Sequence, residues 1–354
     1  MGNPSLQIDF FKKLLAWYSE NHRPMPWKNI KDPYLIWVSE IILQQTRVSQ
    51  GWSYYENFKS KFPHLKNLAE ADLHYVLKAW EGLGYYTRAR NLHKTAKYIH
   101  YELNGTFPAS YEALLKLPGI GEYTAAAISS FAFGLPYAVV DGNVIRVLSR
   151  YFGIGSSGLN DGLLKLKIKD IATSIIKNGD PAVFNQAIMD FGATCCVPSN
   201  PDCNKCPVKL ECFAFNNNMV DIFPPKKKKL QKKDRWFNFY LIKFRDGIYI
   251  QNRLGNDIWK NLFQLPCIET ESFDDLNVQQ DFVPNDLIVD VITPAKIYKH
   301  VLTHQTIYAS FSIFELKTAL IPDKDDLIYA ERKNLCNFAF PKLIQKFLRE
   351  QELV

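Results

Sequence analysis

Long hydrophobic runs are scarce in this sequence, and so are the other marks of a membrane or fibrous protein. Residues 123–140 form 18 residues without charge, but Gly134 and Pro136 interrupt them. They therefore predict a buried helix followed by a loop rather than a membrane span. The N-terminus has no apolar core before a small-residue cleavage site, so we expect no targeting segment and a cytoplasmic protein. No period of 20–50 residues repeats, which excludes a solenoid.

The excess of positive over negative charge is also small, and most of it lies in one short segment. The formal net charge is +7, of which residues 1–225 hold +4, residues 226–235 hold +6 and residues 236–354 hold −3. A positive balance favours a polyanionic partner such as nucleic acid. Because most of the excess lies in the segment KKKKLQKKDR, two readings stay open. The segment either follows a DNA backbone or is a solvated linker.

The pattern of apolar residues predicts two modules. Over the first 220 residues they recur at helical spacing, and short loops rich in Gly and Pro separate the helical pieces. The Pro-Pro pair and the lysine run then predict an extended linker over residues 222–235. We expect an all-α domain over residues 1–221 and a smaller α+β domain over residues 236–354.

The second module contains segments rich in β-branched and aromatic residues, which predict strands. Asp246-Gly247 predicts a tight hairpin between the first two strands. The predicted elements are strands over 236–244, 248–251 and 306–314, and a final helix over 341–349.

Cysteine is sparse, yet four of the seven cysteines fall within 17 residues. Their spacing is Cys196-x6-Cys203-x2-Cys206-x5-Cys212. Disulfides are disfavoured in a cytoplasmic enzyme, and structural zinc more often uses two C-x2-C pairs. Four thiolates in one compact loop suit an iron–sulfur cluster. The spacing leaves all three readings open. We expect Cys195 to be a bystander, and Cys267 and Cys336 to be small buried hydrophobes.

The segment Leu117-Pro118-Gly119-Ile120-Gly121 lies between two helical stretches. Gly119 and Gly121 allow the backbone to approach a partner closely. The helix that opens near Glu122 presents free N–H groups, which can hold a DNA phosphate without reading sequence. Any pair of antiparallel helices can use such a turn, so the motif alone leaves plain packing open.

About 20 residues further on, Asp141 lies within the segment AVVDGNVIRV. Its local sequence predicts an N-cap for a helix beginning near Val144. The order of the parts (hairpin, aspartate, four-cysteine loop) adds a functional alternative.

These parts, in this order, resemble the endonuclease III superfamily of helix-hairpin-helix DNA glycosylases, and within it the MutY-type adenine DNA glycosylases. The resemblance covers most of the chain. It is carried by five segments of the first module and by residues 259–266 of the second module. Residues 37–46 resemble the catalytic-glutamate helix, 82–92 the DNA-intercalating loop, 117–124 the hairpin, 140–150 the catalytic-aspartate segment, 196–212 the cluster loop and 259–266 a turn of the MutT-like domain.

The resemblance implies a multidomain fold: an all-α helix-hairpin-helix glycosylase module with an iron–sulfur loop, and a C-terminal α+β MutT/Nudix-like domain. It implies a [4Fe-4S] cluster on Cys196, Cys203, Cys206 and Cys212. It also implies a monomeric base excision repair enzyme of the bacterial nucleoid, with double-stranded DNA containing A:8-oxoguanine or A:G mispairs as its partner. The Nudix signature G-x5-E-x7-R-E-x2-E-E is absent, so we predict no pyrophosphatase activity.

Removal of adenine needs two carboxylates in different states, one that protonates the base and one that stabilises the cationic sugar. The resemblance assigns these roles to Glu40 and Asp141, with Asn143 beside the latter. Glu40 lies among apolar residues, where burial would raise its pKa; Asp141, at a helix start, is placed to stay anionic. Tyr123 stands where lyases of this superfamily have lysine. A phenol forms no Schiff base, so we predict hydrolysis by water.

The resemblance also implies where the DNA lies. The adenine pocket is predicted to comprise Arg23, Trp27, Leu43, Gln186 and Met189. Gln45, Thr46, Leu83 and Tyr85 would face the opposite strand, with Tyr85 as a wedge. Thr303 and His304 would contact the lesion, in a Leu302-Thr303-His304 triplet that replaces the family's Phe-Ser-His. The backbone contacts would come from Gly119, Gly121, Arg88 and Arg90.

Two other functions stay open at this point. One is an endonuclease III-like glycosylase/lyase acting on oxidised pyrimidines, against which Tyr123 and the second module argue. The other is a non-enzymatic protein that binds damaged DNA, against which Glu40 and Asp141 argue.

Overall fold

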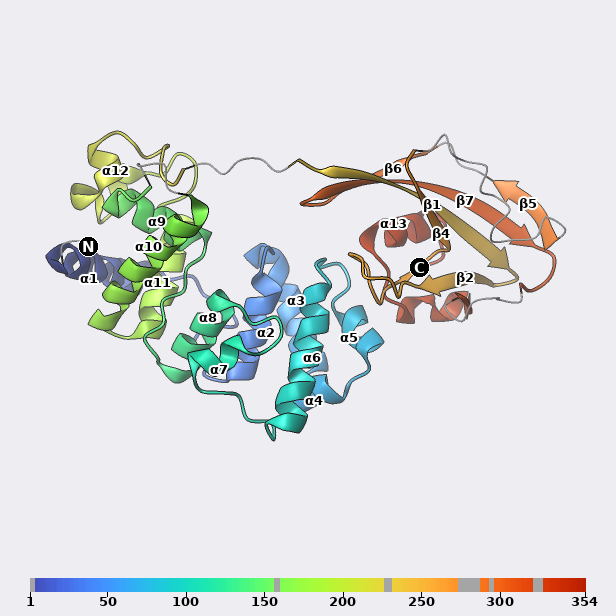
Figure 1. Ribbon diagram of the computed structural model, residues 1–354, viewed down its shortest axis with the longest axis horizontal. Helices are drawn as coiled ribbons and strands as arrows, with labels where there is room; N and C mark the ends of the chain where they lie inside the picture. The colour runs from blue at the N-terminus through green and yellow to red at the C-terminus, as the bar shows by residue number, and fades with distance from the viewer. Residues whose placement is uncertain (1–3, 156–159, 226–230, 273–286, 293–295, 321–326) are drawn as a thin grey trace. The chain divides into compact units, whose positions relative to one another are not determined.

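The computed structural model describes residues 4–155, 160–225, 231–272, 287–292, 296–320 and 327–354 (Figure 1). Two compact units result: Met1–Ala69 with Lys94–Lys228, and Glu70–His93 with Lys229–Val354. The first five lysine-run residues, 226–230, lie outside the described residues. The domain boundaries at 221 and 236 follow the sequence and stay a prediction.

Helices make up most of the chain up to residue 216. In order they are α1 (Pro4–Asn21), α2 (Pro33–Leu43), α3 (Val48–Lys61), α4 (Leu65–Glu70), α5 (Leu73–Ala79), α6 (Thr87–Glu102), α7 (Tyr111–Leu115), α8 (Glu122–Phe133), α9 (Gly142–Phe152), α10 (Asp161–Ile175), α11 (Pro181–Thr194) and α12 (Phe213–Asn216). Short 3-10 turns at Ile176–Asn178, Cys203–Lys205 and Lys209–Glu211 connect the later ones.

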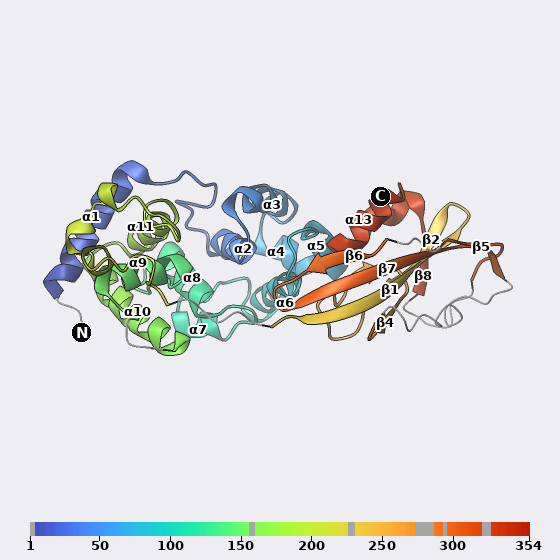
Figure 2. The ribbon, with the colours of Figure 1, turned by 90° about the horizontal axis from the view of Figure 1, so that it is seen from above.

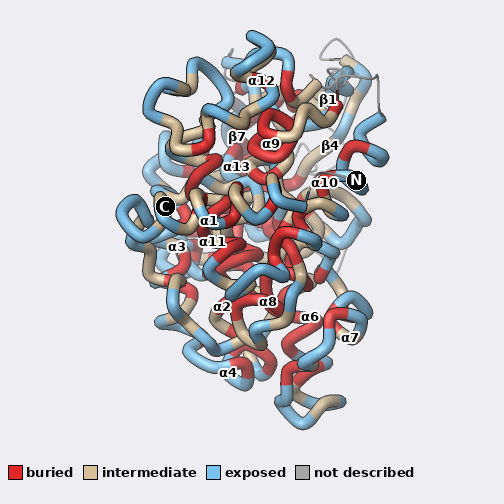
Figure 3. The backbone as a smooth tube through the Cα atoms, turned by 90° about the vertical axis from the view of Figure 1, so that its left-hand side faces the viewer, coloured by how far each residue is buried: buried red, intermediate tan, exposed pale blue. Residues whose placement is uncertain are grey.

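Aspartate side chains begin the helices that matter most for the site. Asp32, Asp141 and Asp180 each accept a hydrogen bond from a backbone N–H in the first turn of α2, α9 and α11. Pro33 and Pro181 occupy the first helical position, where a missing N–H costs nothing. Figure 3 shows the buried residues that α2, α8, α9 and α11 contribute to the core of the first unit.

The predicted hairpin lies between α7 and α8. Gly119 has a φ of +77°, which a side chain would disfavour, and Gly121 is the N-cap of α8 without any side-chain cap. The predicted buried helix and following loop are confirmed as α8 and the loop residues 134–140. Asn185 of α11 anchors that loop, because its side chain bonds Val139 N–H, Tyr137 C=O and Ser130 Oγ.

The second unit contains one mixed sheet, of eight strands among the described residues, in the order β3-β2-β1-β7-β5; β4 also pairs with β1, β6 with β7 and β8 with β2. Its strands are β1 (Lys233–Phe244), β2 (Gly247–Asn252), β3 (Phe263–Gln264), β4 (Cys267–Thr270), β5 (Ile288–Ile292), β6 (Tyr298–Val301), β7 (Gln305–Leu316) and β8 (Leu327–Glu331). The two longest strands, β1 and β7, run parallel from the pair Lys233–Gln305 to the pair Lys243–Glu315. Figure 2 shows β6, β7, β1 and β4 side by side.

Helix α13 (Lys342–Glu350) covers one face of this sheet (Figure 1). The rings of Phe347 on α13 and Phe311 on β7 stack with centroids 3.9 Å apart. The predicted three strands, the hairpin and the final helix are all confirmed.

Strand β1 begins within the predicted linker and includes its last three residues. Residues 233–235 belong to β1, where they pair with residues 305–307 of β7. The charge run obscured this, because Arg235 is held in the strand by ion pairs to Asp257 and Glu269. A paired arginine can occupy a strand position that charge alone would place in solvent.

Candidate active site

Glu40 is a buried carboxyl group in the last turn of α2, with 6% of its surface exposed. Burial raises its pKa to about 7, and the nearby Asp141 adds to this, while a hydrogen bond with Tyr123 opposes it. The expectation that burial raises this pKa is confirmed. A carboxyl group in this state can donate a proton at neutral pH.

Asp141 is the N-cap of α9 and is half-buried. Its Oδ1 accepts the Val144 N–H at 2.8 Å, and its Oδ2 accepts Asn143 Nδ2–H at 2.8 Å. Burial raises the pKa of Asp141, which is opposite to the effect expected of a helix start, although these hydrogen bonds act against the rise. The predicted N-cap is confirmed, and its helix begins at Gly142.

Tyr123 of α8 lies near both carboxyl groups and contacts α11. Its hydroxyl is hydrogen-bonded with Glu40 and donates to Met189 Sδ at 3.7 Å. Burial and both carboxylates raise its pKa well above the usual value. The phenol therefore stays protonated and serves as a neutral hydrogen-bonding group beside the acid.

Arg146, one turn into α9, supports Asp141 through Asn143. Its Nη2–H donates to Asn143 Oδ1 at 2.9 Å and to the Gly192 carbonyl at 2.6 Å, and its Nε–H donates to the Cys196 carbonyl at 2.8 Å. Gly192 permits this approach, because a Cβ there would lie 2.7 Å from Asn143 Cβ. Sequence reasoning missed Arg146. The available signal was a charged residue at a core-facing position of an otherwise apolar helix segment.

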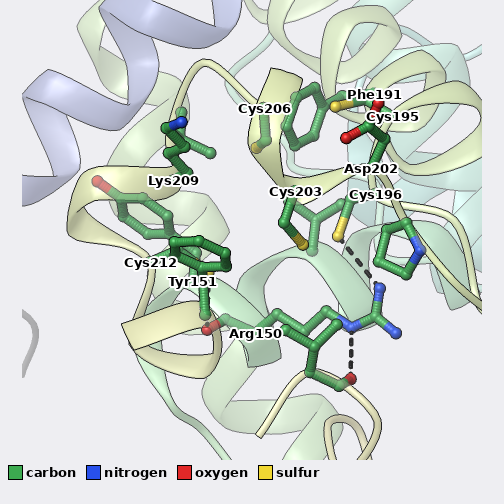
Figure 4. A pocket seen from close by; sticks show the side chains of 15 residues that line it. Arg150, Tyr151, Phe191, Cys195, Cys196, Asp202, Cys203, Cys206, Lys209 and Cys212 are labelled. Atoms are coloured by element: carbon green, nitrogen blue, oxygen red, sulfur yellow. Dashed lines mark hydrogen bonds between the residues drawn. The ribbon is translucent and has the colours of Figure 1, made fainter. Parts of the chain in front are cut away.

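The four spaced cysteines line one small cavity of about 30 Å³, together with Cys195 (Figure 4). Arg150 holds this loop, since its Nη1–H contacts Cys196 Sγ at 3.5 Å and donates to the Val197 carbonyl at 2.7 Å. All seven cysteines are free thiols in the structure. Among the described residues, no group of three or more His, Cys, Asp or Glu is arranged to hold a metal ion.

Cys195 lines the same cavity as the four spaced cysteines, and its expected place as a bystander stays a prediction. The expectation that Cys336 is buried was wrong. Cys336 is exposed rather than buried, since it lies on the surface turn Arg332–Asn337. Position in a turn, rather than residue type, determines the exposure of Cys336.

The predicted adenine-pocket residues come from three segments of the first unit. Trp27 is buried in the loop before α2, with the rings of Trp52 and Tyr55 against it at 6.1 and 5.6 Å. Leu43 ends α2 and lies so close to Gly51 that a Cβ there would approach its Cδ2 to 2.8 Å. Met189 and Gln186 are half-buried on α11, and Met189 contacts Tyr123.

Two of the residues predicted to face the opposite strand have unusual backbones. Gln45 and Tyr85 both adopt left-handed conformations, with φ of +55° and +48°, and both side chains are exposed. Such a conformation is uncommon for residues with a side chain and occurs at functional sites. Thr46 is half-buried beside Gln45, and Leu83 is buried.

Within the second unit, the loop 82–87 and the segment 300–305 line a cavity of about 520 Å³. The hydroxyl groups of Tyr85 and Thr303 are hydrogen-bonded to each other, and His304 lines the same cavity. Ile258, Trp259, His300 and Lys342 also line it. Sequence reasoning missed Ile258 and Lys342, because only tertiary packing places them beside the loop.

The two arginines predicted to contact the DNA backbone also hold this loop in place. Arg88 Nη2–H donates to the Gly84 carbonyl at 3.3 Å, and its guanidinium lies 5.2 Å from the Trp80 ring. Arg90 donates to the Lys260 carbonyl at 2.8 Å and to Thr87 Oγ1 at 2.7 Å. Their contact with phosphate stays a prediction.

The sequence matches two protein-family models. Residues 38–162 match the HhH-GPD superfamily base excision DNA repair protein, and residues 238–350 match the NUDIX domain. An adenine DNA glycosylase of Buchnera aphidicola subsp. Baizongia pistaciae (strain Bp) is 40% identical over 303 residues, which cover 84% of each chain. Another, from the subspecies Schizaphis graminum (strain Sg), is 36% identical over 96% of this chain and 97% of its own.

The chain belongs to the adenine DNA glycosylases. It is thus a DNA N-glycosylase of the helix-hairpin-helix class, with a Nudix-like domain at its C-terminal end. Among solved structures, a thermostable thymine-DNA glycosylase aligns with a TM-score of 0.56 and 31% identity. It covers 60% of this adenine DNA glycosylase and 98% of that chain. The part of the chain that the structure describes contains no helix long and apolar enough to cross a membrane.

Proposed function

We propose that this adenine DNA glycosylase removes adenine mispaired with 8-oxoguanine or guanine in duplex DNA, by hydrolysis and without a lyase step. The observation that supports this most directly is the buried Glu40, whose pKa is raised to about 7 and which is hydrogen-bonded with Tyr123 and close enough to Asp141 to feel its charge. Two carboxyl groups in different environments can divide the acid and the stabilising roles.

The reaction begins when the adenine leaves the stack and enters the pocket. Glu40 transfers its proton to N7 of the base, the C1′–N9 bond breaks with its electron pair moving to the base, and neutral adenine departs. The ionised Asp141 stabilises the positive charge on the sugar. Water then adds to C1′, and the proton that the water loses restores the acid form of Glu40.

Tyr123 supports the absence of a lyase step. A lyase needs an amine to attack C1′, and the group beside Glu40 at this position is a phenol that stays protonated. Its hydrogen bond orients the carboxyl group of Glu40 towards the base. Asn143 in turn fixes Asp141, because its amide is bonded to Asp141 Oδ2.

The lesion would be read by the cavity of the second unit. The base opposite the adenine would stack on Tyr85, whose hydroxyl is bonded to Thr303. 8-Oxoguanine differs from guanine in a carbonyl oxygen at C8 and a donor at N7, so Thr303 and His304 supply groups of the right kind. Gln45 and Thr46 of the first unit and Leu83 of the second unit would also face the opposite strand.

The cysteine loop would hold a [4Fe-4S] cluster on Cys196, Cys203, Cys206 and Cys212. The donor set fits, because four thiols line one cavity and a cubane binds its thiolates to different irons rather than at one point. The bound cluster would cross-link this loop. Iron content and visible absorbance of the purified protein test the assignment, and a colourless, iron-free, folded protein would contradict it.

The hairpin would hold the DNA backbone. The N–H groups at the start of α8 have no side-chain cap, and a Cβ at Gly121 would meet only open space, so a phosphate can approach. Arg88 and Arg90 would add positive charge. We further propose that the enzyme is monomeric and acts on the nucleoid of a bacterial cytoplasm.

The experiment is single-turnover release of free adenine from an A:8-oxoguanine duplex. Wild type should release adenine, and Glu40→Gln should lose at least ~100-fold in rate while still binding the duplex. Glu20→Gln, at an exposed position of α1, is the matched control. A covalent protein–DNA adduct trapped by borohydride would show a lyase and contradict the proposal, as would full activity of Glu40→Gln.

The assignment of the lesion-reading residues is tested by the ratio of the rates on A:8-oxoguanine and A:G duplexes rather than by either rate alone. Thr303→Ala and His304→Ala should each lower the preference for A:8-oxoguanine over A:G, because both side chains line the cavity. Lys299→Ala, on the neighbouring exposed part of β6, serves as the control. If the two rates fall together and their ratio is unchanged, the cavity does not read the lesion.

A further inference from the structure

Asp190 of α11 is a buried carboxylate with no role in the proposed reaction. Only 1% of its side chain is exposed. It accepts hydrogen bonds from Arg23 N–H at 3.0 Å, Arg23 Nε–H at 2.9 Å and Arg23 Nη2–H at 2.7 Å, and from Lys28 Nζ at 2.5 Å. Both cations come from the loop between α1 and α2. One carboxylate on α11 therefore fixes this loop at two points.

The Lys28 ammonium depends on this carboxylate. Its side chain is only 6% exposed, and a buried charge is costly unless it is paired. Burial lowers the pKa of Lys28, and the hydrogen bond with Asp190 opposes this. The face of the Tyr18 ring, 5.4 Å from Nζ, covers the ammonium further. Removal of the Asp190 charge would leave Lys28 buried without its anion.

Each partner of the Lys28–Asp190 ion pair is adjacent in sequence to a residue of the predicted adenine pocket. Trp27 precedes Lys28, and Met189 precedes Asp190. Met189 contacts Tyr123, which is bonded to Glu40. The Lys28–Asp190 pair thus joins the loop and α11 at the residues adjacent to two predicted walls of the adenine pocket.

We propose that Asp190 is a positioning residue that sets the width of the adenine pocket by holding the Trp27 wall against the Met189 wall. It acts through Lys28 and Arg23 and does not touch the base. The proposal rests on the proposed adenine pocket. Its consequence is selective, because only DNA with a base in the pocket senses the spacing of the walls.

The test compares two duplexes in binding to the full-length Asp190→Asn variant. One has 2′-fluoro-2′-deoxyadenosine opposite 8-oxoguanine, since the fluorine destabilises the cationic sugar and keeps the base attached. The other has a tetrahydrofuran abasic site, which places no base in the pocket. We expect the adenine duplex to bind ~10-fold more weakly and the abasic duplex to change by less than ~2-fold.

Two variants frame this result. Asp180→Asn makes the same substitution on the same helix, where asparagine also caps, and should behave as wild type. Asp190→Glu restores the charge and should recover part of the lost affinity. Equal weakening of both duplexes by Asp190→Asn, or no weakening, overturns the proposal.

Failure of the proposed function remains distinguishable, because then wild type itself releases no adenine. If Asp190→Asn loses its cooperative melting transition, Lys28→Met takes its place. That variant removes one cation and leaves Arg23 paired with Asp190. The same selective loss, smaller in size, is expected. If Lys28→Met weakens binding of both duplexes by the same factor, or weakens neither relative to wild type, the proposal is again overturned.

Discussion

At the scale of single residues, the protonation state of Glu40 determines when this enzyme can act. Its neighbours are apolar side chains of α2 on one side and Tyr123 on the other, so the carboxyl group loses water without gaining a cation. Burial thereby penalises the charged form. Asp141 adds to the effect through its negative charge. The acid form of Glu40 therefore persists to neutral pH.

The single-turnover rate should fall as pH rises through about 7, the pKa of Glu40. A general acid works while it is protonated, so the rate is full below its pKa and drops roughly tenfold per unit above it. Measurement of adenine release from about pH 5.5 to about pH 9 checks this. The Glu20→Gln control should follow the wild-type curve. A rate that rose with pH across this range would assign the acid role elsewhere.

Gly192 should tolerate no side chain. A Cβ there would lie 2.7 Å from Asn143 Cβ, so Gly192→Ala displaces the residue that fixes Asp141. We expect a loss of about 10-fold or more in single-turnover rate, because small misplacements of reacting groups are costly. Gly162→Ala on α10 is the control, since its nearest neighbour would be at an ordinary 3.5 Å. An unchanged rate in Gly192→Ala would show that Asn143 does not position Asp141.

At the scale of elements, α13 stabilises the sheet of the second unit with an aromatic face. Phe347 stacks on Phe311 of β7, and both are fully or nearly fully buried. Phe347→Ala should destabilise the unit by about 3–5 kcal/mol through the cavity that it leaves. Thermal unfolding measures this, and Arg349→Ala on the exposed side of α13 should change stability by less than about 0.5 kcal/mol. Equal shifts in the two variants would contradict the stacking argument.

Local patterns predicted the elements that local chemistry determines. The glycines of the hairpin and Asp246-Gly247 each act on their own turn, and both elements formed as predicted. Asp141 was predicted as a cap for the same reason. The burial of Glu40 followed from its apolar neighbours in α2.

Contacts between distant segments could not be predicted in this way. Asp190 meets Arg23 across 167 residues, and Tyr85 meets Thr303 across 218. Nothing near Asp190 distinguishes it from a solvated aspartate on an amphipathic helix. The left-handed backbones of Gln45 and Tyr85 were equally hidden, because residue type argues against them and only the surrounding structure imposes them.

At the scale of the whole molecule, the distribution of charge matters more than its sum. The net charge is +7, and the segment 226–235 alone holds +6. Arg88 and Arg90 already donate hydrogen bonds within the protein, to the carbonyls of Gly84 and Lys260. The lysine run is thus the densest positive charge in the sequence, although residues 226–230 lie outside the described part.

Replacement of Lys226–Lys229 by glutamine should reduce the salt dependence of DNA binding. Each lysine that pairs with a phosphate contributes about 0.9 to the slope of log affinity against log salt concentration. Binding titrations over several salt concentrations measure the slope. Lys12→Gln, at an exposed position of α1, serves as a control for loss of a lysine elsewhere. An unchanged slope would make the run a solvated linker.

The second unit is assembled from two stretches of chain that are far apart in time as well as in sequence. Lys78 donates to the carbonyl of Phe338, and Glu81 accepts the N–H of Phe340, across 260 and 259 residues. A ribosome that adds about 5–20 residues per second needs roughly 13–50 s to make that interval. During synthesis, Lys78 and Glu81 therefore lack these hydrogen-bond partners until the last part of the chain has been made. A chain that stops short of residue 338 never completes these bonds, so a late stop codon disturbs a segment near the start of the protein.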